Sequence, residues 1–145
     1  MSWAYFDTSA LIKRYVHERT SHDFEAFLGT ESGDLVISPL GLTEFESMLK
    51  RRLRRREFDH AYLERSRDLL GRDIEGGIWS IQAFDSNVIP PATRLIREID
   101  LPLATLDAIH LASAQAFGCD RLATGDRQLA RAAERCGLSV HEFVD

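Results

Sequence analysis

The sequence predicts an α/β fold with three layers, in which helices cover both faces of a mostly parallel sheet. Short apolar runs alternate along the chain with longer stretches whose apolar residues recur at helical spacing. Glycine or proline stands at most of the changes between the two patterns. Strands that alternate with helices are expected to pair in parallel, because each helix returns the chain to the starting edge of the sheet. With 145 residues the chain is long enough for a real core, and we expect one domain over residues 1–145.

The N-terminal half begins with the clearest strand. The apolar run Trp3–Phe6 ends abruptly at Asp7, as a buried strand ends at a turn. Thr8 or Ser9 can cap the helix that follows, which keeps helical spacing to about His17. The other elements predicted in this half are a short helix capped by Ser21 and closed by Gly29, a strand at 35–37, a long helix from Pro39 and a helix capped by Asp59.

The C-terminal half repeats this alternation. Ile78–Ile81 follows a Gly-Gly break and is predicted as a third strand. The pattern from Asp85 to Ile99 is helical, although Pro90 and Pro91 must lie in its first turn or delay its start. The other predicted elements are an Ala-rich helix from Leu106 to Phe117, a strand at 121–123, a helix from the turn Thr124-Gly125-Asp126 through Cys136, and a strand at 138–141.

Composition and charge exclude several classes of protein. No apolar run approaches the length of a membrane span, and the first residues lack the basic region and apolar core of a signal peptide. Cys119 and Cys136 show no Cys-x-x-Cys spacing, which favours a reduced, cytoplasmic protein over a zinc site or a disulfide scaffold. The net charge of −5 excludes a generally basic nucleic-acid-binding protein.

Four acidic residues occupy related places in the predicted fold. Asp7 and Asp126 each follow a strand and precede a helix, while Glu44 and Asp107 lie near helix N-termini. In an open parallel sheet, these places face the edge at the carboxyl ends of the strands, where ligands bind. Four carboxylates that converge there repel one another unless a cation is present.

The chemistry of such a cluster points to a nuclease. Oxygen ligands without His or Cys select Mg²⁺, with Mn²⁺ as a substitute. One such ion, or a pair, activates water and stabilises charge on a phosphodiester. We therefore expect the catalytic and metal-binding residues to be Asp7, Glu44, Asp107 and Asp126.

The same acids also have a purely structural interpretation. The three aspartates are favourable helix caps, and Glu44 is favourable beside the positive end of a helix dipole. Glu46 is a rival for the role of Glu44, but two residues along a helix it faces another way. Asp85 is interpreted as a cap. The hypothesis of a site therefore depends on the joint occurrence of the four acids in this order.

Other polar residues near the acids allow two interpretations. The hydroxyls of Thr8, Ser9 and Thr124 can orient the acids or a water on the metal, or they can only cap helices. His110 lies three residues after Asp107 on the same helix face, where it can contact an RNA phosphate or act as a general acid. The rest of that helix is apolar, which favours a buried, hydrogen-bonded histidine instead.

Six basic residues fall within positions 50–56, a third of the 18 in the chain. One interpretation is a solvated helix end, where cations are favourable beside the C-terminal dipole. The other is a surface that binds RNA phosphates beside the acidic cleft, for which arginine is well suited. The candidate RNA-binding residues in this run are Arg51, Arg52, Arg54, Arg55 and Arg56.

Four segments carry a resemblance to a known family over nearly the whole chain. They are Tyr5-Phe6-Asp7-Thr8-Ser9-Ala10-Leu11, Ser38-x5-Glu44, the stretch from Leu106 to Ala114 (LDAIHLASA), and Leu122-Ala123-Thr124-Gly125-Asp126-x2-Leu129. Together they resemble the PIN domain, and more narrowly the VapC-type toxins of bacterial and archaeal toxin–antitoxin pairs.

The resemblance implies a five-stranded parallel sheet and an Mg²⁺-dependent endoribonuclease with acids at Asp7, Glu44, Asp107 and Asp126. It also implies a homodimer and a small antitoxin, similar to VapB, that covers the cleft. We expect the apolar side of that antitoxin to fit a groove lined by Phe45, Met48, Leu49, Tyr62 and Leu63.

Three other functions have weaker support in the sequence. A phosphotransferase of the haloacid-dehalogenase type needs a second acid two residues after Asp7, where Ser9 stands. A receiver-like signalling domain needs a lysine after the last strands, and the only lysines are Lys13 and Lys50. The alternative that stays open is a catalytically inactive RNA- or partner-binding domain on the same fold, which the intact acids disfavour.

Overall fold

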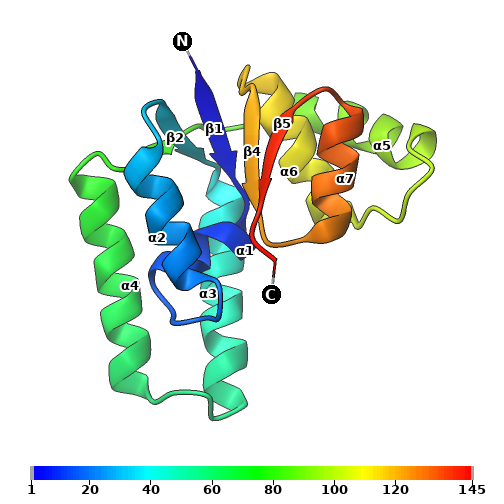
Figure 1. The fold of residues 1–145 in the computed structure, drawn as a ribbon. Helices are drawn as coiled ribbons and strands as arrows, with labels where there is room; N and C mark the ends of the chain where they lie inside the picture. The colour runs from blue at the N-terminus through cyan, green and yellow to red at the C-terminus, as the bar shows by residue number, and fades with distance from the viewer. Residues whose placement is uncertain (1, 145) are drawn as a thin grey trace.

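Five short strands form the sheet of this protein. The computed structural model describes residues 2–144. The strands are β1 (Trp3–Phe6), β2 (Asp34–Ile37), β3 (Ser80–Ile81), β4 (Arg121–Thr124) and β5 (Ser139–Glu142). They pair in parallel in the order β3-β2-β1-β4-β5 (Figure 1), which confirms the predicted parallel sheet.

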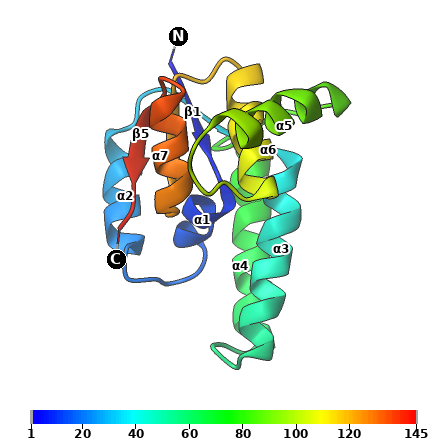
Figure 2. The same cartoon turned by 90° about the vertical axis from the view of Figure 1, so that its right-hand side faces the viewer.

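Helices cover both faces of this sheet. One side carries α1 (Thr8–Leu11), α2 (Ser21–Thr30), α3 (Pro39–Arg54) and α4 (His60–Glu75), and the other carries α5 (Ile89–Glu98), α6 (Thr105–Ala116) and α7 (Arg127–Arg135), as Figures 1 and 2 show. A 3₁₀ turn at Ile12–Arg14 continues α1, and another at Ser86–Val88 precedes α5. The architecture is the three-layer sandwich that the sequence predicts.

Side chains alternate between the two faces of β1, as strand geometry requires. Ala4 and Phe6 pack in the core under α2, α3 and α4. The ring of Phe6 meets those of Phe24 and Trp79 at centroid distances of 5.9 and 5.0 Å. Tyr5 points to the other face, into the core formed with α6 and α7. Both faces of the central strand are buried, which explains its continuous apolar run.

The first helix is shorter than predicted. The regular turns end at Arg14, and the helical pattern that suggested an end near His17 does not continue. Tyr15 and Val16 are nevertheless buried, with 5% and 4% of their surface exposed. Both side chains pack into the core although they lie in the turn after the helix, so their apolar character does not indicate a longer helix.

The second helix also differs at both ends. Ser21 is its first residue, not its cap, and its hydroxyl accepts a hydrogen bond from the backbone N of Glu18 (2.8 Å) in the preceding turn. Gly29 does not close the helix, because α2 continues to Thr30. Asp59, in contrast, caps α4 as predicted and accepts from the backbone N of Tyr62 at 2.9 Å.

The third strand contains two residues instead of the predicted four. The backbone N of Ile78 donates to the carbonyl of Asp73 (2.9 Å), so Ile78 still belongs to the turn that ends α4. Gly77 makes this turn possible with a φ of 79°. Only Ser80 and Ile81 enter the sheet.

The proline pair lies where the sequence requires. Pro90 and Pro91 are in the first turn of α5, where a helix needs no backbone N–H donor. Asp85 accepts from the backbone N of Asn87 (2.8 Å) and caps the 3₁₀ turn before α5, as predicted.

The strand order creates one topological switch point, between β1 and β4. From β1 the chain builds outward through β2 and β3, and it then returns to β4 and continues to β5 in the other direction. In such sheets a crevice opens outside the carboxyl ends of the two central strands. That edge faces downward in Figure 1.

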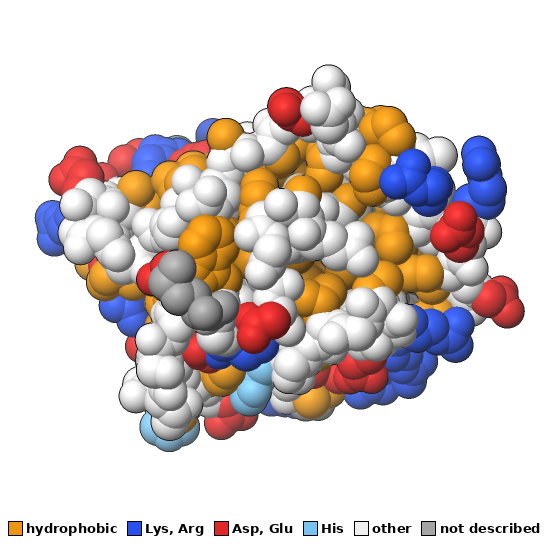
Figure 3. Space-filling view, turned by 90° about the horizontal axis from the view of Figure 1, so that it is seen from above, with side chains coloured by type: hydrophobic (Ala, Val, Ile, Leu, Met, Phe, Trp, Pro, Cys, Tyr) orange, Lys and Arg blue, Asp and Glu red, His pale blue; other side chains and the backbone are white. Residues whose placement is uncertain are grey.

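The opposite end of the molecule has a different surface. Figure 3 views the protein from the amino ends of the strands, where hydrophobic side chains spread over the middle and most charged ones lie toward the margins. No helix within residues 2–144 combines the length and apolar character needed to cross a bilayer.

Candidate active site

Asp7 is almost fully buried at the end of β1, with 3% of its surface exposed. Its carboxylate accepts hydrogen bonds from the backbone N of Ala10 (3.0 Å), the hydroxyl of Ser9 (2.8 and 2.9 Å) and the hydroxyl of Thr124 (2.8 Å). Asp7 therefore caps α1 and is also tied to β4. Burial raises the pKa of Asp7, although the positive charge of His110 and these hydrogen bonds oppose the rise.

The hydroxyls of Ser9 and Thr124 join the two loops of the switch point. Ser9 Oγ accepts from the backbone N of Gly125 (2.8 Å), and Thr124 Oγ1 accepts from that of Asp126 (2.9 Å). Each hydroxyl also donates to Asp7. One hydrogen-bond network thus holds Asp7 in place relative to the backbone of Asp126.

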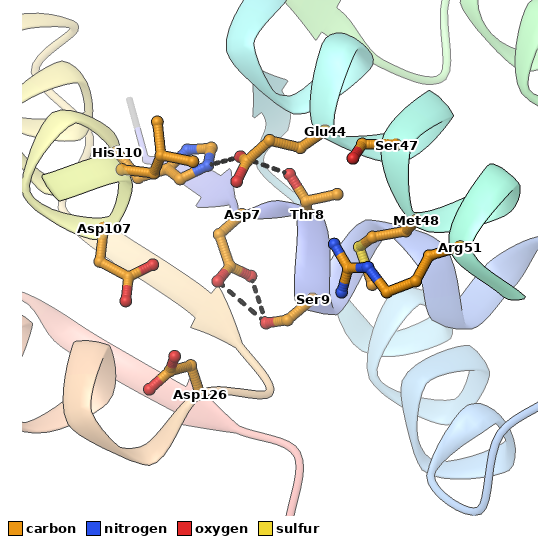
Figure 4. A pocket seen from close by; sticks show the side chains of 11 residues that line it. Asp7, Thr8, Ser9, Glu44, Ser47, Met48, Arg51, Asp107, His110 and Asp126 are labelled. Carbon is orange, nitrogen blue, oxygen red and sulfur yellow. Dashed lines mark hydrogen bonds and ion pairs between the residues drawn. The ribbon is translucent and has the colours of Figure 1, made fainter. Parts of the chain in front are cut away.

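Asp126 has the cap geometry that the structural interpretation allows. Its carboxylate accepts from the backbone N of Gln128 (2.8 Å) and of Leu129 (3.2 Å) at the start of α7. These bonds use Oδ1 of Asp126. Figure 4 shows the side chain at the edge of the same cavity as Asp7 and Asp107.

Asp107 does not cap a helix. Ala104 occupies the cap position of α6, and no side chain makes the capping bond there. Burial, together with the negative charges of Asp126 and Asp7, raises the pKa of Asp107 to about 7. The three aspartates therefore share one electrostatic environment.

Glu44 reaches the cavity from α3. Its Oε1 accepts from the hydroxyl of Thr8 (2.9 Å) and from Nε2 of His110. Burial raises the pKa of Glu44, but the hydrogen bonds from His110 and Thr8 outweigh burial and leave the pKa below its usual value. Glu46 forms two hydrogen bonds of 2.7 Å with Arg67 and does not line the cavity, which confirms that it faces another way.

His110 is 2% exposed and uses both ring nitrogens inside the protein. Its Nδ1 lies 2.5 Å from the hydroxyl of Tyr5, and its Nε2 pairs with Glu44. The hydroxyl of Tyr5 also donates to Ser38 Oγ at 3.1 Å. The ring has no free nitrogen for a phosphate, which argues against the predicted RNA contact and confirms the buried, hydrogen-bonded alternative.

These side chains surround a cavity of about 240 Å³, which Figure 4 shows from close by. It is lined by Asp7, Thr8, Ser9, Glu44, Ser47, Met48, Arg51, Leu106, Asp107, His110 and Asp126. All four predicted acids are among them. Of the three predicted hydroxyl residues, Thr8 and Ser9 line the cavity, whereas Thr124 is buried and donates a hydrogen bond to Asp7.

The basic run does not form one surface. Arg51 lines the cavity, whereas Arg52 forms an ion pair with Glu18. Residues 54–56 lie at the far end of α3 and in the turn beyond it. At a rise of about 1.5 Å per residue, they begin about 15 Å along the helix from Glu44.

The apolar groove expected for a partner is not present in the form that we predicted. Phe45, Leu49 and Leu63 are 1%, 0% and 2% exposed and belong to the core. Met48 and Tyr62 are partly buried beside it. The apolar sides of α3 and α4 thus pack on the sheet and on each other, and that part of the prediction is wrong.

The donor chemistry of the cavity fits a hard divalent cation, because all four candidate ligands are carboxylates. Within residues 2–144, no three His, Cys, Asp or Glu side chains lie close enough to ligate one ion in their present positions. The charges of Asp126 and Asp7 contribute to the raised pKa of Asp107, so these carboxylates repel one another when no cation is present. Metal binding at these residues therefore requires side-chain rotation.

Sequence reasoning missed two residues that support the site. Tyr5 was interpreted only as core, yet its hydroxyl contacts His110. Lys13 is buried and donates to Thr20 (2.6 Å) and Glu18 (3.1 Å). Its Cε would lie 3.1 Å from a Cβ at Gly125, so this lysine supports the loop before Asp126. No local pattern marks either role.

Comparison with known proteins agrees with this geometry. The PIN domain family model matches residues 4–135. The chain is 32% identical over 148 residues to a Mycobacterium tuberculosis protein named ribonuclease VapC46, covering 97% of each chain.

Solved structures share the fold. One is M. tuberculosis VapC20, described as a toxin that cleaves the sarcin–ricin loop, with a TM-score of 0.70, 15% identity and coverage of 89% of this chain and 94% of that one. Another is a toxin–antitoxin complex from Klebsiella pneumoniae, with a TM-score of 0.62, 23% identity and coverage of 88% and 90%. The family match and the close relative are decisive: the chain belongs to the PIN domain family, among the VapC-type ribonucleases.

Proposed function

We propose that the chain is the toxin of a toxin–antitoxin pair, an endoribonuclease that hydrolyses RNA phosphodiester bonds with Mg²⁺ at Asp7, Glu44, Asp107 and Asp126. The observation that carries the proposal is the meeting of four carboxylates from four separate segments in one cavity at the switch point. The name of the M. tuberculosis relative and the description of VapC20 support the ribonuclease and toxin assignments.

A bound Mg²⁺, for which Mn²⁺ can substitute, would supply Lewis-acid stabilisation of the phosphodiester and promote ionisation of water. Asp7 would offer a ligand whose position Ser9 and Thr124 already fix. Asp107, with a pKa of about 7, would release its proton as the cation arrives. The ionised carboxylates therefore repel one another without a cation, and a bound cation would remove this repulsion.

Arg51 adds a positive charge on the opposite wall. Figure 4 shows its guanidinium directed into the cavity, across from Asp107 and Asp126. No carboxylate of residues 2–144 lies within ion-pair distance of it. The guanidinium is thus available for an RNA phosphate that enters beside the acids.

The partner and assembly state belong to the same proposal. A small antitoxin similar to VapB would cover the cavity and place a cation among the carboxylates. The toxin–antitoxin complex from K. pneumoniae, a structural neighbour, supports a partner of this kind. The homodimer that the family resemblance implies and the cytoplasmic location that the cysteine spacing favours stay predictions.

The first prediction tests the nuclease directly. Purified protein should cleave a structured RNA in the presence of Mg²⁺ or Mn²⁺, and EDTA should stop the reaction. Asp7→Asn and Asp107→Asn should each lower kcat by at least about a hundredfold, because each removes a ligand charge. Cleavage followed on a labelled RNA, with circular dichroism to verify folding, measures both effects.

Asp85→Asn is the matched control, since Asn is as good a cap as Asp and residue 85 lies outside the cavity. Its activity should equal that of the wild type. RNA binding without cleavage in any metal would favour the alternative, a catalytically inactive RNA-binding domain.

A further inference from the structure

A buried chain of hydrogen bonds leads from the core to Glu44. It runs from Ser38 Oγ to the hydroxyl of Tyr5 (3.1 Å), on to Nδ1 of His110 (2.5 Å), and from Nε2 of His110 to Oε1 of Glu44. Ser38, Tyr5 and His110 are 1%, 0% and 2% exposed. Solvent reaches only the Glu44 end of this chain, so the buried bonds among Ser38, Tyr5 and His110 hold these three side chains in one geometry.

The direction of the last bond does not depend on where the other protons lie. Tyr5 has one hydroxyl hydrogen, which it can give to Ser38 or to Nδ1 of His110. A glutamate side chain ordinarily has a pKa of about 4.3 and is ionised at neutral pH, and an ionised carboxylate only accepts hydrogen bonds. Nε2 of His110 therefore carries a hydrogen in both arrangements and donates it to Glu44.

Both protein donors reach the same oxygen of Glu44. The hydroxyl of Thr8 (2.9 Å) and Nε2 of His110 both bind Oε1, and Figure 4 shows the two contacts converging there. Oε2 has no hydrogen-bond partner among the described residues, and the Glu44 side chain is 24% exposed. The carboxylate is thus anchored through one oxygen and presents the other to the cavity.

We infer that His110 is a positioning residue, which with Tyr5 and Thr8 holds Glu44 by Oε1 so that Oε2 would be the oxygen offered to a bound metal ion. This inference rests on the proposed function and adds a division of labour within it. Asp7 is held by loop hydroxyls and Glu44 is held from behind by a histidine, whereas Asp107 makes no side-chain hydrogen bond within residues 2–144. An acid fixed in this way keeps its orientation when the other carboxylates rotate toward an ion.

The test compares His110→Ala with His110→Gln, because the amide of Gln places a donor near the position of Nε2. We expect His110→Ala to lower both kcat and the affinity for Mn²⁺ by about 10- to 100-fold, the usual effect of losing a partner that orients a metal ligand. KM for RNA should change little, since His110 has no contact surface for RNA. His110→Gln should recover most of both losses.

A double-mutant cycle isolates the route through Glu44. If His110 acts only by orienting Glu44, the double variant His110→Ala/Glu44→Gln should be no worse than Glu44→Gln alone. Thr8→Val, which removes the other donor to Oε1 with little change of shape, should give a smaller loss of the same kind. It keeps the test valid where His110→Ala fails to fold.

Ser113→Ala is the matched control, because Ser113 is buried on the same helix and its hydroxyl has no partner within residues 2–144. It should leave kcat and Mn²⁺ affinity unchanged. Additive losses in the double variant, or wild-type Mn²⁺ affinity in folded His110→Ala, would overturn the inference. If the wild type itself cleaves no RNA, the proposed function fails, while Mn²⁺ titration calorimetry still decides the role of His110.

Discussion

At the scale of single residues, the cavity contains two kinds of carboxylate. Asp7 and Glu44 accept hydrogen bonds from neighbouring side chains. The side-chain donors to Asp7 are two hydroxyls, and the donors to Glu44 are one hydroxyl and one histidine. Asp107 accepts no such hydrogen bond within residues 2–144, and burial and the charges of Asp126 and Asp7 raise its pKa to about 7. The repulsion among these carboxylates therefore acts chiefly on the ionised form of Asp107.

That repulsion predicts a pH dependence of stability for the metal-free protein. An aspartate in the unfolded chain has a pKa of about 3.9, whereas Asp107 in the folded protein has a pKa of about 7. Between these values the folded state binds more protons, so the contribution of Asp107 destabilises the fold increasingly as pH rises through this window. Asp107→Asn should remove this contribution.

Urea denaturation of both proteins without metal, at about pH 5 and about pH 8, measures the difference. The gain in stability from Asp107→Asn should be larger at the higher pH, and saturating Mg²⁺ should reduce it. A gain that does not change with pH would mean that Asp107 ionises normally.

At the scale of secondary-structure elements, α3 connects three different environments. Its first turns carry Glu44 into the cavity, and Arg51 lies on the same wall about two turns later. Arg52 points toward the loop before α2 and pairs with Glu18. Residues 54–56 extend beyond the site at the end of the helix, as the long α3–α4 hairpin in Figure 2 shows. One basic stretch of sequence therefore lies in three different environments.

Charge removal along α3 should separate these roles. Arg51→Gln should lower kcat/KM and reduce the slope of log affinity against log salt by about 0.7, the value for one phosphate contact to single-stranded RNA. The double variant Arg54→Gln/Arg55→Gln should flatten the salt dependence only, because these residues lie outside the cavity. Filter binding at several salt concentrations and initial rates measure the two effects.

Arg94→Gln, an exposed position on α5, serves as the control for net charge. Equal salt slopes for all four proteins would show that the basic run is a solvated helix end and not an RNA-binding surface.

At the scale of the whole molecule, the fold places negative charge at one edge. The switch between β1 and β4 brings the loops after both strands together, and helices from the two outer layers close the cavity from either side. Low-dielectric walls around several carboxylates focus their field outward. A regulator with a mobile Arg or Lys can use this field in place of the metal.

A cognate partner should therefore compete with the metal. Binding should raise the thermal stability of the protein by mass action, about 2.7 kcal/mol at a hundredfold excess over Kd. Asp107→Asn should weaken binding of the partner, because Asp107 lines the cavity and accepts no side-chain hydrogen bond within residues 2–144, so an inserted cation can pair with it. Titration of the co-purified partner against both proteins, with and without Mg²⁺, measures these effects. If neither Mg²⁺ nor Asp107→Asn changes the affinity of the partner, the partner binds away from the acidic cavity.

The sequence by itself determined the layer architecture and the place of the four acids. Strand and helix periodicities are local properties, and acids that directly follow strands or open helices of a parallel sheet must meet at its carboxyl edge. The predicted sheet is confirmed, and the four acids line one cavity. Their roles stay predictions until they are measured.

Only the tertiary structure decided which side chains support those acids. The contacts of His110 with Tyr5 and Glu44 join residues 105 and 66 positions apart, a relation that depends on strand register and helix rotation. For the same reason Phe45 proved to be core, and Arg51 alone of the candidate arginines reached the cavity. Local pattern shows that a residue is apolar or charged, whereas packing across the fold decides what that residue touches.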